Sequence, residues 1–316
     1  MVIVNGCGGH QTPCQSNNLK QETRLRNAVK AGAVNKVFKS ARILFMGFLA
    51  LVMTSCITPQ PQPPSRTLLG GPHAFFGPSA WKAYNLDPDE SMKALADNWL
   101  SFKFEVFGDD PPRYNLDKAV EYCQAILKAS EKHGVMGCLT LSNGNDDYWA
   151  RGVGLAYFKP AIDKILASAK TDRVIIEAVS ESSASKPLQV QFENYVFNEW
   201  HVKRGGAMSW NRGSRPTSLP SGYDVLDFHV FNMDQRKSIP KSIARPIVSA
   251  DTTPMVYWLT GKSEYGTKYV PGTVYEMVKT CLSEKFWGVD VYPGNHDKLD
   301  IKSIEAAGKA IKEVLK

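Results

Sequence analysis

Two acidic side chains, Glu181 and Asp251, each follow an apolar run, and the runs are far apart in the sequence. Glu181 comes just after Val174–Val179, and Asp251 follows Pro246–Ala250. The first run is typical of a strand buried on both faces of a parallel sheet. Two carboxyl groups that face each other across one rim of such a sheet can cleave a glycosidic bond. One protonates the leaving oxygen, while the other attacks the sugar or activates water.

Further polar and aromatic side chains follow other apolar runs. Polar groups there can bind hydroxyl groups, and flat aromatic faces edged by polar groups suit sugar rings. The candidate substrate-binding residues are Glu177, Ser180, Trp149, Trp210, Asn211, His229, Trp258 and Tyr292. Taken singly, each aromatic fits loop packing as well, and His229 fits a core histidine bonded to backbone. Glu181 alone could be a solvated loop acid and Asp251 a structural cap.

From about residue 72, apolar strand-like segments alternate with amphipathic helical segments. This alternation predicts a parallel sheet covered by helices. The expected strands are 73–76, 102–107, 135–141, 174–179, 206–210, 225–230, 246–250 and 286–291. The expected helices are 91–100, 116–133, 155–169, 188–203, 239–243, 272–283 and 301–315.

Eight strands with crossovers over about 245 residues predict an α/β fold, a single (β/α)₈ TIM barrel. The helix between strands five and six should be missing or vestigial, because that linker is rich in Pro, Ser and Gly. In such barrels the working residues lie at the C-terminal ends of the strands. The alternative is an open doubly wound sheet. No Gly-x-Gly-x-x-Gly or P-loop sequence follows any strand, which disfavours its nucleotide-binding version.

The apolar run Ile43–Met53 follows basic residues and precedes Thr54, Ser55 and Cys56. These are the parts of a secretory signal, and the run is too short to span a bilayer comfortably. The alternative interpretation of Ile43–Met53 is a buried helix or a membrane anchor. The segment after Cys56 is rich in Pro and Gln and predicts an extended tether. The expected parts are therefore a leader at 1–56, a tether at 57–69 and a barrel at 70–316.

Met53-Thr54-Ser55-Cys56 resembles a bacterial lipobox, although Met replaces the usual Leu at its first position. The resemblance implies that Cys56 becomes the lipidated first residue of an exported, membrane-anchored protein, at the outer membrane or cell surface. The formal net charge of +7 is concentrated in the leader, so we expect no nucleic-acid partner. We expect a monomer.

The cysteines of the barrel region, Cys123, Cys138 and Cys281, fall in helix and strand patterns, so we interpret them as small buried hydrophobes. One disulfide remains an open alternative. The chain has six His and no clustered ligand set. The pairs Asp109-Asp110 and Asp146-Asp147 fit solvated loop tips better than calcium ligands. We therefore expect no metal and no organic cofactor.

The segments that hold the two acids resemble the clan A glycoside hydrolases. Glu177-Ala-Val-Ser-Glu181-Ser182 is similar to the Glu-x-x-Asn-Glu-Pro context at the end of the fourth strand of that family. Arg245-Pro-Ile, leading to Asp251, is similar to the segment before its nucleophile on the seventh strand. The resemblance implies Glu181 as acid/base and Asp251 as nucleophile. His229 resembles the His or Tyr often found near that nucleophile.

Three positions depart from the family pattern: Ser180 replaces Asn, Ser182 replaces Pro, and Asp251 replaces Glu. An Asp carboxyl reaches less far, and a wider pair favours a water between the acids, hence inversion, or disables attack. The chief hypothesis is an exported hydrolase of a polysaccharide or glycan. The alternative is a surface lipoprotein that binds glycan without cleaving it. A metal-assisted barrel hydrolase ranks last, because no clustered His set supports it.

Overall fold

The chain divides into two units, residues 1–62 and residues 63–316. The computed structural model describes only residues of the second unit: 66–77, 86–107, 115–170, 172–210, 219, 221–230, 233–250, 271–291 and 300–316. The predicted signal segment and Cys56 therefore lie outside the described residues. Every described helix and strand belongs to the second unit.

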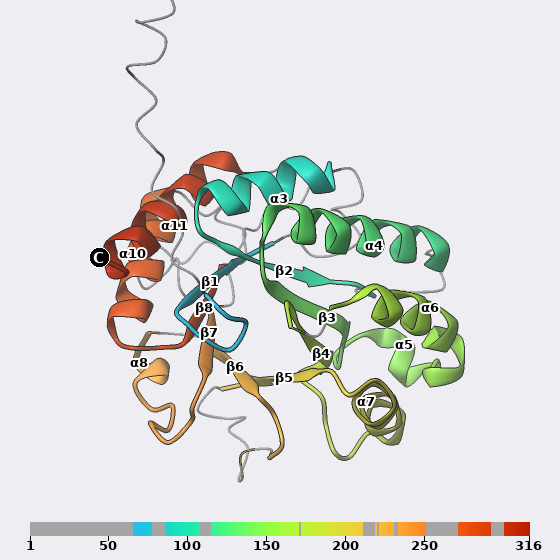
Figure 1. The fold of residues 1–316 in the computed structure, drawn as a ribbon. Coiled ribbons are helices and arrows are strands. Elements are labelled where there is room, and N and C mark those ends of the chain that lie inside the picture. Colours follow the sequence, from blue (N-terminus) through green and yellow to red (C-terminus); the bar gives the residue numbers. More distant parts are fainter. Residues whose placement is uncertain are drawn as a thin grey trace, which may run out of the picture. The chain divides into compact units, whose positions relative to one another are not determined.

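Eight parallel strands form a closed barrel in the order β1 to β8 (Figure 1). The strands are β1 His73–Phe76, β2 Ser101–Glu105, β3 Gly137–Asn143, β4 Val174–Ser180, β5 Lys203–Ser209, β6 Val225–Val230, β7 Pro246–Ala250 and β8 Gly288–Val291. The closure lies between β1 and β8, where His73 pairs with Gly288 and Phe76 with Val291. The predicted (β/α)₈ barrel is confirmed, and the open-sheet alternative is wrong.

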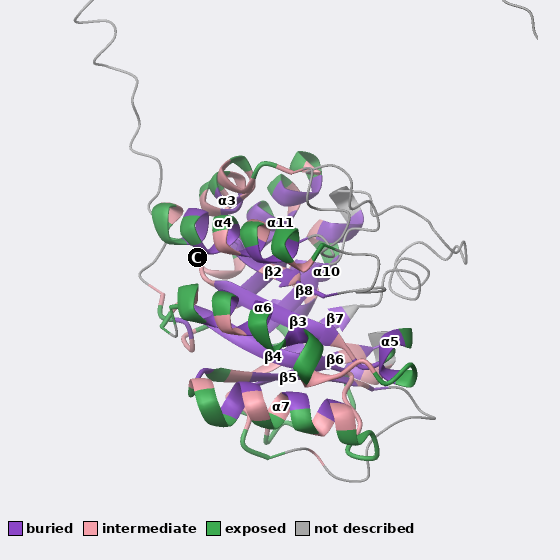
Figure 2. Ribbon diagram, turned by 90° about the vertical axis from the view of Figure 1, so that its right-hand side faces the viewer, coloured by how far each residue is buried: buried purple, intermediate pink, exposed green. Residues whose placement is uncertain are grey.

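The described helices lie outside the barrel (Figure 1). They are α3 Pro88–Asp97, α4 Leu116–His133, α5 Asp147–Ala150, α6 Leu155–Ser168, α7 Pro187–Trp200, α8 Met233–Arg236, α10 Pro271–Ser283 and α11 Ile301–Val314. Figure 2 shows the strands buried and the outer helix faces exposed. Local chemistry sets the helix ends. Asn115 caps α4 by accepting from the Asp117 amide, and Gly134 ends it at φ 70°.

Two sequence expectations about helices need correction. The helix expected at 188–203 ends at Trp200, because His201 adopts a left-handed φ of 48° and Lys203 already begins β5. The short helix expected at 239–243 is absent. The turn instead forms earlier, as α8 directly after β6, and Arg236 at its end binds the Glu284 carboxylate after α10 through two nitrogens. The linker between β5 and β6 falls largely on residues outside the described ranges.

Apolar side chains fill the N-terminal end of the barrel interior. They form a cluster of their own, separate from the larger core between strands and helices. Leu68 belongs to this cluster and is 5% exposed, so the last part of the predicted tether packs into the body. The Leu69 carbonyl accepts hydrogen bonds from Trp287 and Arg245. The chain is thus fixed to the barrel from Arg66 onward.

The three barrel cysteines, Cys123, Cys138 and Cys281, are buried and free, as expected for small hydrophobes. Burial raises the pKa of each thiol, which disfavours the reactive thiolate. Among the described residues, no helix has the length and apolar character needed to cross a membrane.

Candidate functional site at the C-terminal end of the barrel

A polar layer lies above the apolar end of the barrel interior, and strand periodicity explains it. Successive side chains of a strand point to opposite faces, so a residue two positions after an inward one also points inward. Ile175, Val225 and Ile247 belong to the interior apolar cluster. Two positions on, β4 places Glu177, β6 places Asp227 and β7 places Ser249, all buried.

Lys103 from β2 lies close to one acid on each of three other strands, β4, β6 and β8. Its Nζ lies 2.5 Å from Asp227 Oδ2, 3.1 Å from Asp290 Oδ2 and 3.8 Å from Glu177 Oε2. The Ser249 hydroxyl contacts Oδ2 of both Asp227 and Asp290, at 2.7 and 2.9 Å. We call the set Lys103, Glu177, Asp227, Asp290 and Ser249 the ionic layer.

The ionic layer holds three acids and one lysine, and the pKa values of the acids shift in different directions. Burial would lower the pKa of Lys103, but the three carboxyl groups around it hold that pKa well above its ordinary value. Burial likewise favours neutral Asp227, yet the charges of Lys103 and His229 keep its pKa well below the usual range. Burial raises the pKa of Glu177 and Asp290. One ionised pair, Lys103 and Asp227, therefore anchors the layer.

Glu181 lies just beyond the end of β4 in an unusual backbone conformation. Its φ is 52°, in the left-handed region that a non-glycine residue seldom adopts. Its amide donates to the Ala207 carbonyl of β5. A Cβ on Gly144 would lie 2.4 Å from the Glu181 carbonyl oxygen, so only glycine fits there. Strained positions of this kind concentrate at functional sites.

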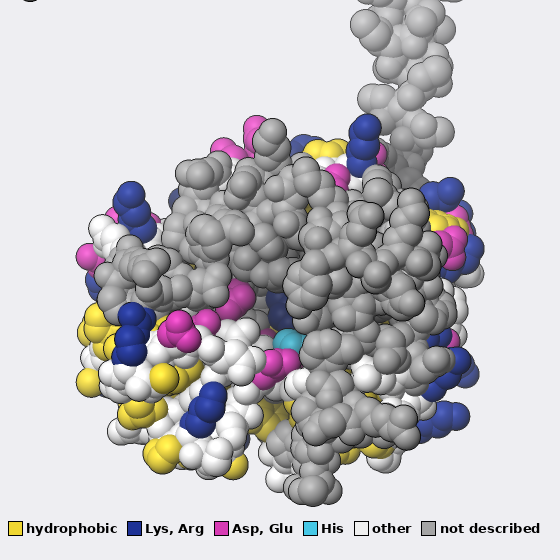
Figure 3. Space-filling model, turned by 180° about the vertical axis from the view of Figure 1, so that it is seen from behind, with side chains coloured by type: hydrophobic (Ala, Val, Ile, Leu, Met, Phe, Trp, Pro, Cys, Tyr) yellow, Lys and Arg dark blue, Asp and Glu magenta, His cyan; other side chains and the backbone are white. Residues whose placement is uncertain are grey.

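The Glu181 carboxylate is held on both oxygens. Asn145 Nδ2 donates to Oε2 at 2.6 Å, and His229 Nδ1 lies 3.0 Å from Oε1. The side chain is 19% exposed and that of His229 is 21% exposed, so both remain reachable by solvent. Figure 3 shows histidine beside acidic side chains near the centre of the face that it presents.

His229 connects Glu181 to the ionic layer. Its Nε2 lies 3.8 Å from Asp227 Oδ2, while Nδ1 faces Glu181. Burial alone would lower the pKa of His229, but the carboxylates of Asp227 and Glu181 raise it to about 10. The hydrogen bond from His229 in turn lowers the pKa of Glu181. At neutral pH this pair is therefore an imidazolium beside an ionised carboxylate.

The raised pKa of His229 predicts a specific dependence of stability on pH. The folded pKa of about 10 lies above the ordinary histidine value of 6.5, so protonated His229 stabilises the fold fully below pH 6.5. That contribution should decline as the pH rises from about 6.5 to about 10. In His229→Gln the decline should be absent. Urea unfolding at pH 6 and pH 9 measures it, and the difference between the two proteins should shrink at pH 9.

A matched control for that measurement is His201→Asn, because His201 is exposed and left-handed, a conformation that Asn tolerates. This variant should keep the pH dependence of the unchanged protein. A gap between His229→Gln and the unchanged protein that stays constant with pH would contradict the charged pair.

Several predicted site residues are described, and the structure brings only some of them together. Glu181 and His229 are in contact, and Glu177 lies below them in the ionic layer. Ser180 is 4% exposed. It is the last residue of β4, where it pairs with Asn143 of β3 and Ala207 of β5. Glu177 is buried and accepts a hydrogen bond from Thr140 Oγ1 at 2.5 Å, so it lies in the barrel interior beneath the rim.

The two described tryptophans predicted to bind substrate are packing residues instead. Trp149 is 7% exposed, its ring packs edge-on against Phe192, and its Nε1 donates to the Asn143 carbonyl. Trp210 is 6% exposed and packs edge-on against Phe228. Neither offers an open aromatic face. Loop position alone suggested that role, and it does not distinguish a ring that faces outward from one that closes the core.

Four predicted residues lie outside the described residues: the proposed catalytic Asp251 and the substrate-binding Asn211, Trp258 and Tyr292. Asp251 follows directly after β7, whose Ala250 pairs with Val230 of β6. Its role stays a prediction from sequence.

Sequence reasoning did not single out the roles of Lys103, Asp227 and Asn145. Lys103 alternates with Phe102 and Phe104 in β2, and a lysine at that place looks like an exposed residue. A signal was nevertheless present, because Asp227 and His229 are two positions apart on one strand and must share a face. Among the described residues, no three His, Cys, Asp or Glu side chains form an arrangement suited to a metal ion.

Comparisons with known proteins identify no family for this chain. No protein-family model matches the chain, and no curated protein matches its sequence. Solved structures are similar over most of the chain. An endo-β-1,4-mannanase from Thermotoga petrophila is 10% identical, with 79% of this chain and 78% of that one covered and a TM-score of 0.47.

A thiamine phosphate pyrophosphorylase from Pyrococcus furiosus is 12% identical, with coverage of 77% and 97% and a TM-score of 0.44. A dihydrodipicolinate synthase from Bacillus clausii is 9% identical, with coverage of 77% and 74% and a TM-score of 0.42. The names of these proteins describe different activities, and none of them is transferred to this chain. The closed order of the strands, β1 to β8, makes the described body of the chain a single (β/α)₈ barrel.

Proposed function

We propose that the barrel is a hydrolase of glycosidic bonds whose proton-transferring carboxylate is Glu181. The observation that carries this proposal is the double hold on Glu181 at the C-terminal end of β4. Asn145 and His229 each bind one of its oxygens, while the side chain stays 19% exposed. A carboxylate held at this end of a barrel, within reach of solvent, is suited to move a proton to or from a bound molecule.

The charge state of Glu181 favours work as a base. The resemblance to clan A implies an acid/base residue that first donates a proton, which requires a raised pKa. The hydrogen bond from His229 lowers the pKa of Glu181 instead. Glu181 would accept a proton from a water molecule while the oxygen of that water attacks the anomeric carbon. A second carboxyl group would protonate the leaving oxygen, and Asp251 is the predicted candidate.

This division of roles implies inversion at the anomeric carbon. A water molecule between base and sugar needs a separation of about 6.5–9.5 Å between the two carboxyl groups. The Asp at position 251 is one methylene shorter than the Glu of the family pattern, which fits a wider pair. The products are a free sugar hemiacetal of opposite configuration and an alcohol.

One observation favours the second candidate function, glycan binding without cleavage. Glu181 is paired with a protonated histidine, and a carboxylate held in an ion pair can serve to orient sugar hydroxyl groups alone. The buried Trp149 and Trp210 do not add to this alternative, because neither presents a face for stacking.

A hydrolysis assay separates the two candidates. Residues 63–316 contain the whole described barrel and its core, so this unit should fold by itself. It is incubated with a panel of polysaccharides and aryl glycosides, and the release of reducing sugar is measured. The proposal expects release from at least one member, with loss of release in Glu181→Gln and in Asp251→Asn. Proton NMR of the first product should show the inverted anomer.

The matched control is Asp172→Asn, an exposed acid before the N-terminal end of β4. This change should leave hydrolysis unaltered. Hydrolysis that survives Glu181→Gln undiminished would reject the site. Binding to a panel member without any hydrolysis would select the second candidate.

A further inference from the structure

A hollow with a volume of about 580 Å³ lies on the barrel wall, away from Glu181. It is bordered by the β6–β7 connection and the segment that follows α10. Its apolar floor includes Ile239, Ile243 and Phe286, and Lys241 and Lys285 line its border. We call it the lysine groove.

The lysine groove carries positive charge that nearby acids do not neutralise. Glu284 also lines it, but that carboxylate is bound by two nitrogens of Arg236, which is 4% exposed. Lys241 and Lys285 are exposed, and among the described residues neither has an acidic partner. Lys285 also adopts a left-handed φ of 67°, where glycine is the usual residue.

The groove adjoins the point where the preceding chain joins the barrel. Arg66 donates to the carbonyls of Pro72 and Trp99, and the Leu69 carbonyl accepts from Arg245 and Trp287. Arg245 and Trp287 are the chain neighbours of Pro246 and Phe286, which line the groove. The described chain therefore begins close to this groove.

The predicted signal segment and the predicted lipidation site, Cys56, lie a short distance along the chain before Arg66. Residues 57–65 separate Cys56 and the apolar run Ile43–Met53 from the fixed part of the chain. Fully extended, that connection spans at most about 30–35 Å. Any membrane that held a lipid on Cys56 would lie within about this distance of Arg66.

We propose that the lysine groove is a docking surface for an anionic lipid bilayer. Lys241 and Lys285 would contact lipid phosphate groups, and the apolar floor would face the interfacial region. The charge of the groove complements such a surface, and lysines close to an anionic leaflet add binding energy that falls off within a Debye length. Docking of this kind orients the barrel at a membrane and does not depend on the proposed hydrolase activity.

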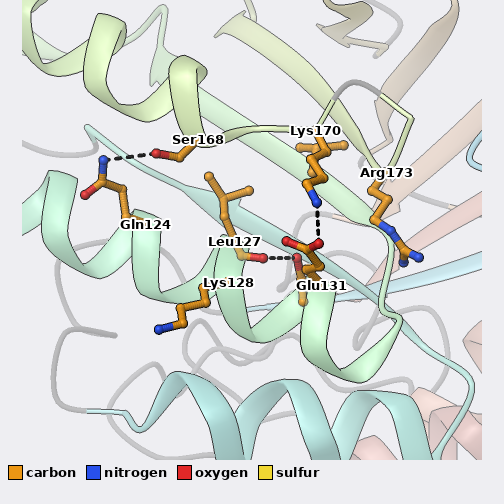
Figure 4. Close-up of a pocket in the computed structure, with 9 residues that line it drawn as sticks. Gln124, Leu127, Lys128, Glu131, Ser168, Lys170 and Arg173 are labelled. Carbon is orange, nitrogen blue, oxygen red and sulfur yellow. Dashed lines mark hydrogen bonds and ion pairs between the residues drawn. The ribbon is translucent and has the colours of Figure 1, made fainter.

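The hollow between α4 and α6 supplies a contrast (Figure 4). Lys170 there points at Glu131 and forms an ion pair with it, so its charge is already satisfied. Lys128 on α4 is exposed at its border, and Lys118 is exposed on the same helix. The pair Lys118 and Lys128 thus allows the same change of charge at a place that the proposal does not assign to lipid.

The test is co-sedimentation of residues 63–316 with phosphatidylcholine vesicles that contain or lack phosphatidylglycerol. Binding should require phosphatidylglycerol and should weaken with salt. Lys241→Gln with Lys285→Gln should reduce the partition coefficient roughly 10- to 30-fold, at about five-fold per lysine. Lys118→Gln with Lys128→Gln should leave it within about two-fold, although both double variants lose the same charge. Circular dichroism checks that each protein is folded.

Three outcomes would overturn the proposal. The first is absence of binding to vesicles with phosphatidylglycerol at low salt. The second is an equal loss in both double variants, which would show a response to net charge alone. The third is a dimer in sedimentation velocity that the groove variants dissociate, which would assign the groove to a second copy of the chain.

Discussion

Replacing Lys103 by Met is expected to lower the free energy of unfolding by about 3–5 kcal/mol, the usual cost of removing one partner from a buried ion pair. Lys103 Nζ lies 2.5 Å from Asp227 Oδ2, and the side chain of Asp227 is 2% exposed. The other oxygen, Oδ1, is buried with no hydrogen-bond partner among the described residues. Lys103 is therefore the nearer of the two cations that balance the charge of Asp227, since His229 Nε2 lies 3.8 Å from Oδ2. Urea unfolding followed by circular dichroism measures the loss.

The loss should depend on pH in a direction that identifies its cause. In the unchanged protein the pKa of Asp227 lies below its usual range, so its ionised form stabilises the fold at neutral pH. That stability is lost as the pH falls through the folded pKa. In Lys103→Met this pKa should rise, because only His229 then opposes the effect of burial. The gap between variant and unchanged protein should then narrow as the pH falls from 7 to 5, because Asp227 becomes neutral.

Two further variants separate charge from packing. Lys93→Met removes an exposed lysine that also pairs with an aspartate, Asp97 at 2.6 Å, and it should change stability little because solvent screens that pair. Adding Asp227→Asn to Lys103→Met should restore part of the lost stability, because it removes a buried charge that has lost its nearer cation. A double variant less stable than Lys103→Met alone would mean that Lys103 acts chiefly through packing.

The ionic layer explains why the barrel was predictable from sequence while its interior was not. Apolar runs such as 225–230 fix a strand by composition, and the structure gives β6 the same bounds. The alternation within that run also fixes that Asp227 and His229 share a face. It does not say which lysine meets them, since Lys103 lies 124 positions away from Asp227 in the chain. Register around a closed barrel decides that contact, and no local pattern encodes it.

The candidate site shows the same division. Glu181 could be selected because parallel strands bring their carboxyl ends to one rim, and His229 because it falls at the end of another strand. Their direct contact at 3.0 Å could be found only from the three-dimensional structure. The same holds for the charge state of Glu181. The resemblance implied a proton donor, while the hydrogen bond from His229 favours an ionised carboxylate. Side-chain burial also could not be read from loop position, as Trp149 demonstrates.

Replacing Glu181 by Gln is expected to lower kcat about 10²- to 10⁴-fold on any glycoside that the unchanged protein cleaves, the usual contribution of a positioned proton-transfer group. Gln keeps the shape of the side chain and an oxygen for Asn145 Nδ2, but it cannot accept the proton of an attacking water. KM should change much less than kcat, because the lost interaction forms only as the proton moves. Steady-state kinetics on the most responsive panel substrate measures both constants.

The same variant carries a readout that is independent of activity. His229 would lose one of the two carboxylates that raise its pKa to about 10, so its imidazole should titrate at lower pH in Glu181→Gln. NMR of the ring protons against pH follows this directly. A fall in kcat together with that shift ties the activity to the described pair. An unchanged titration of His229 would show that Glu181 and His229 are not coupled in solution, and a fall in kcat would then have another origin.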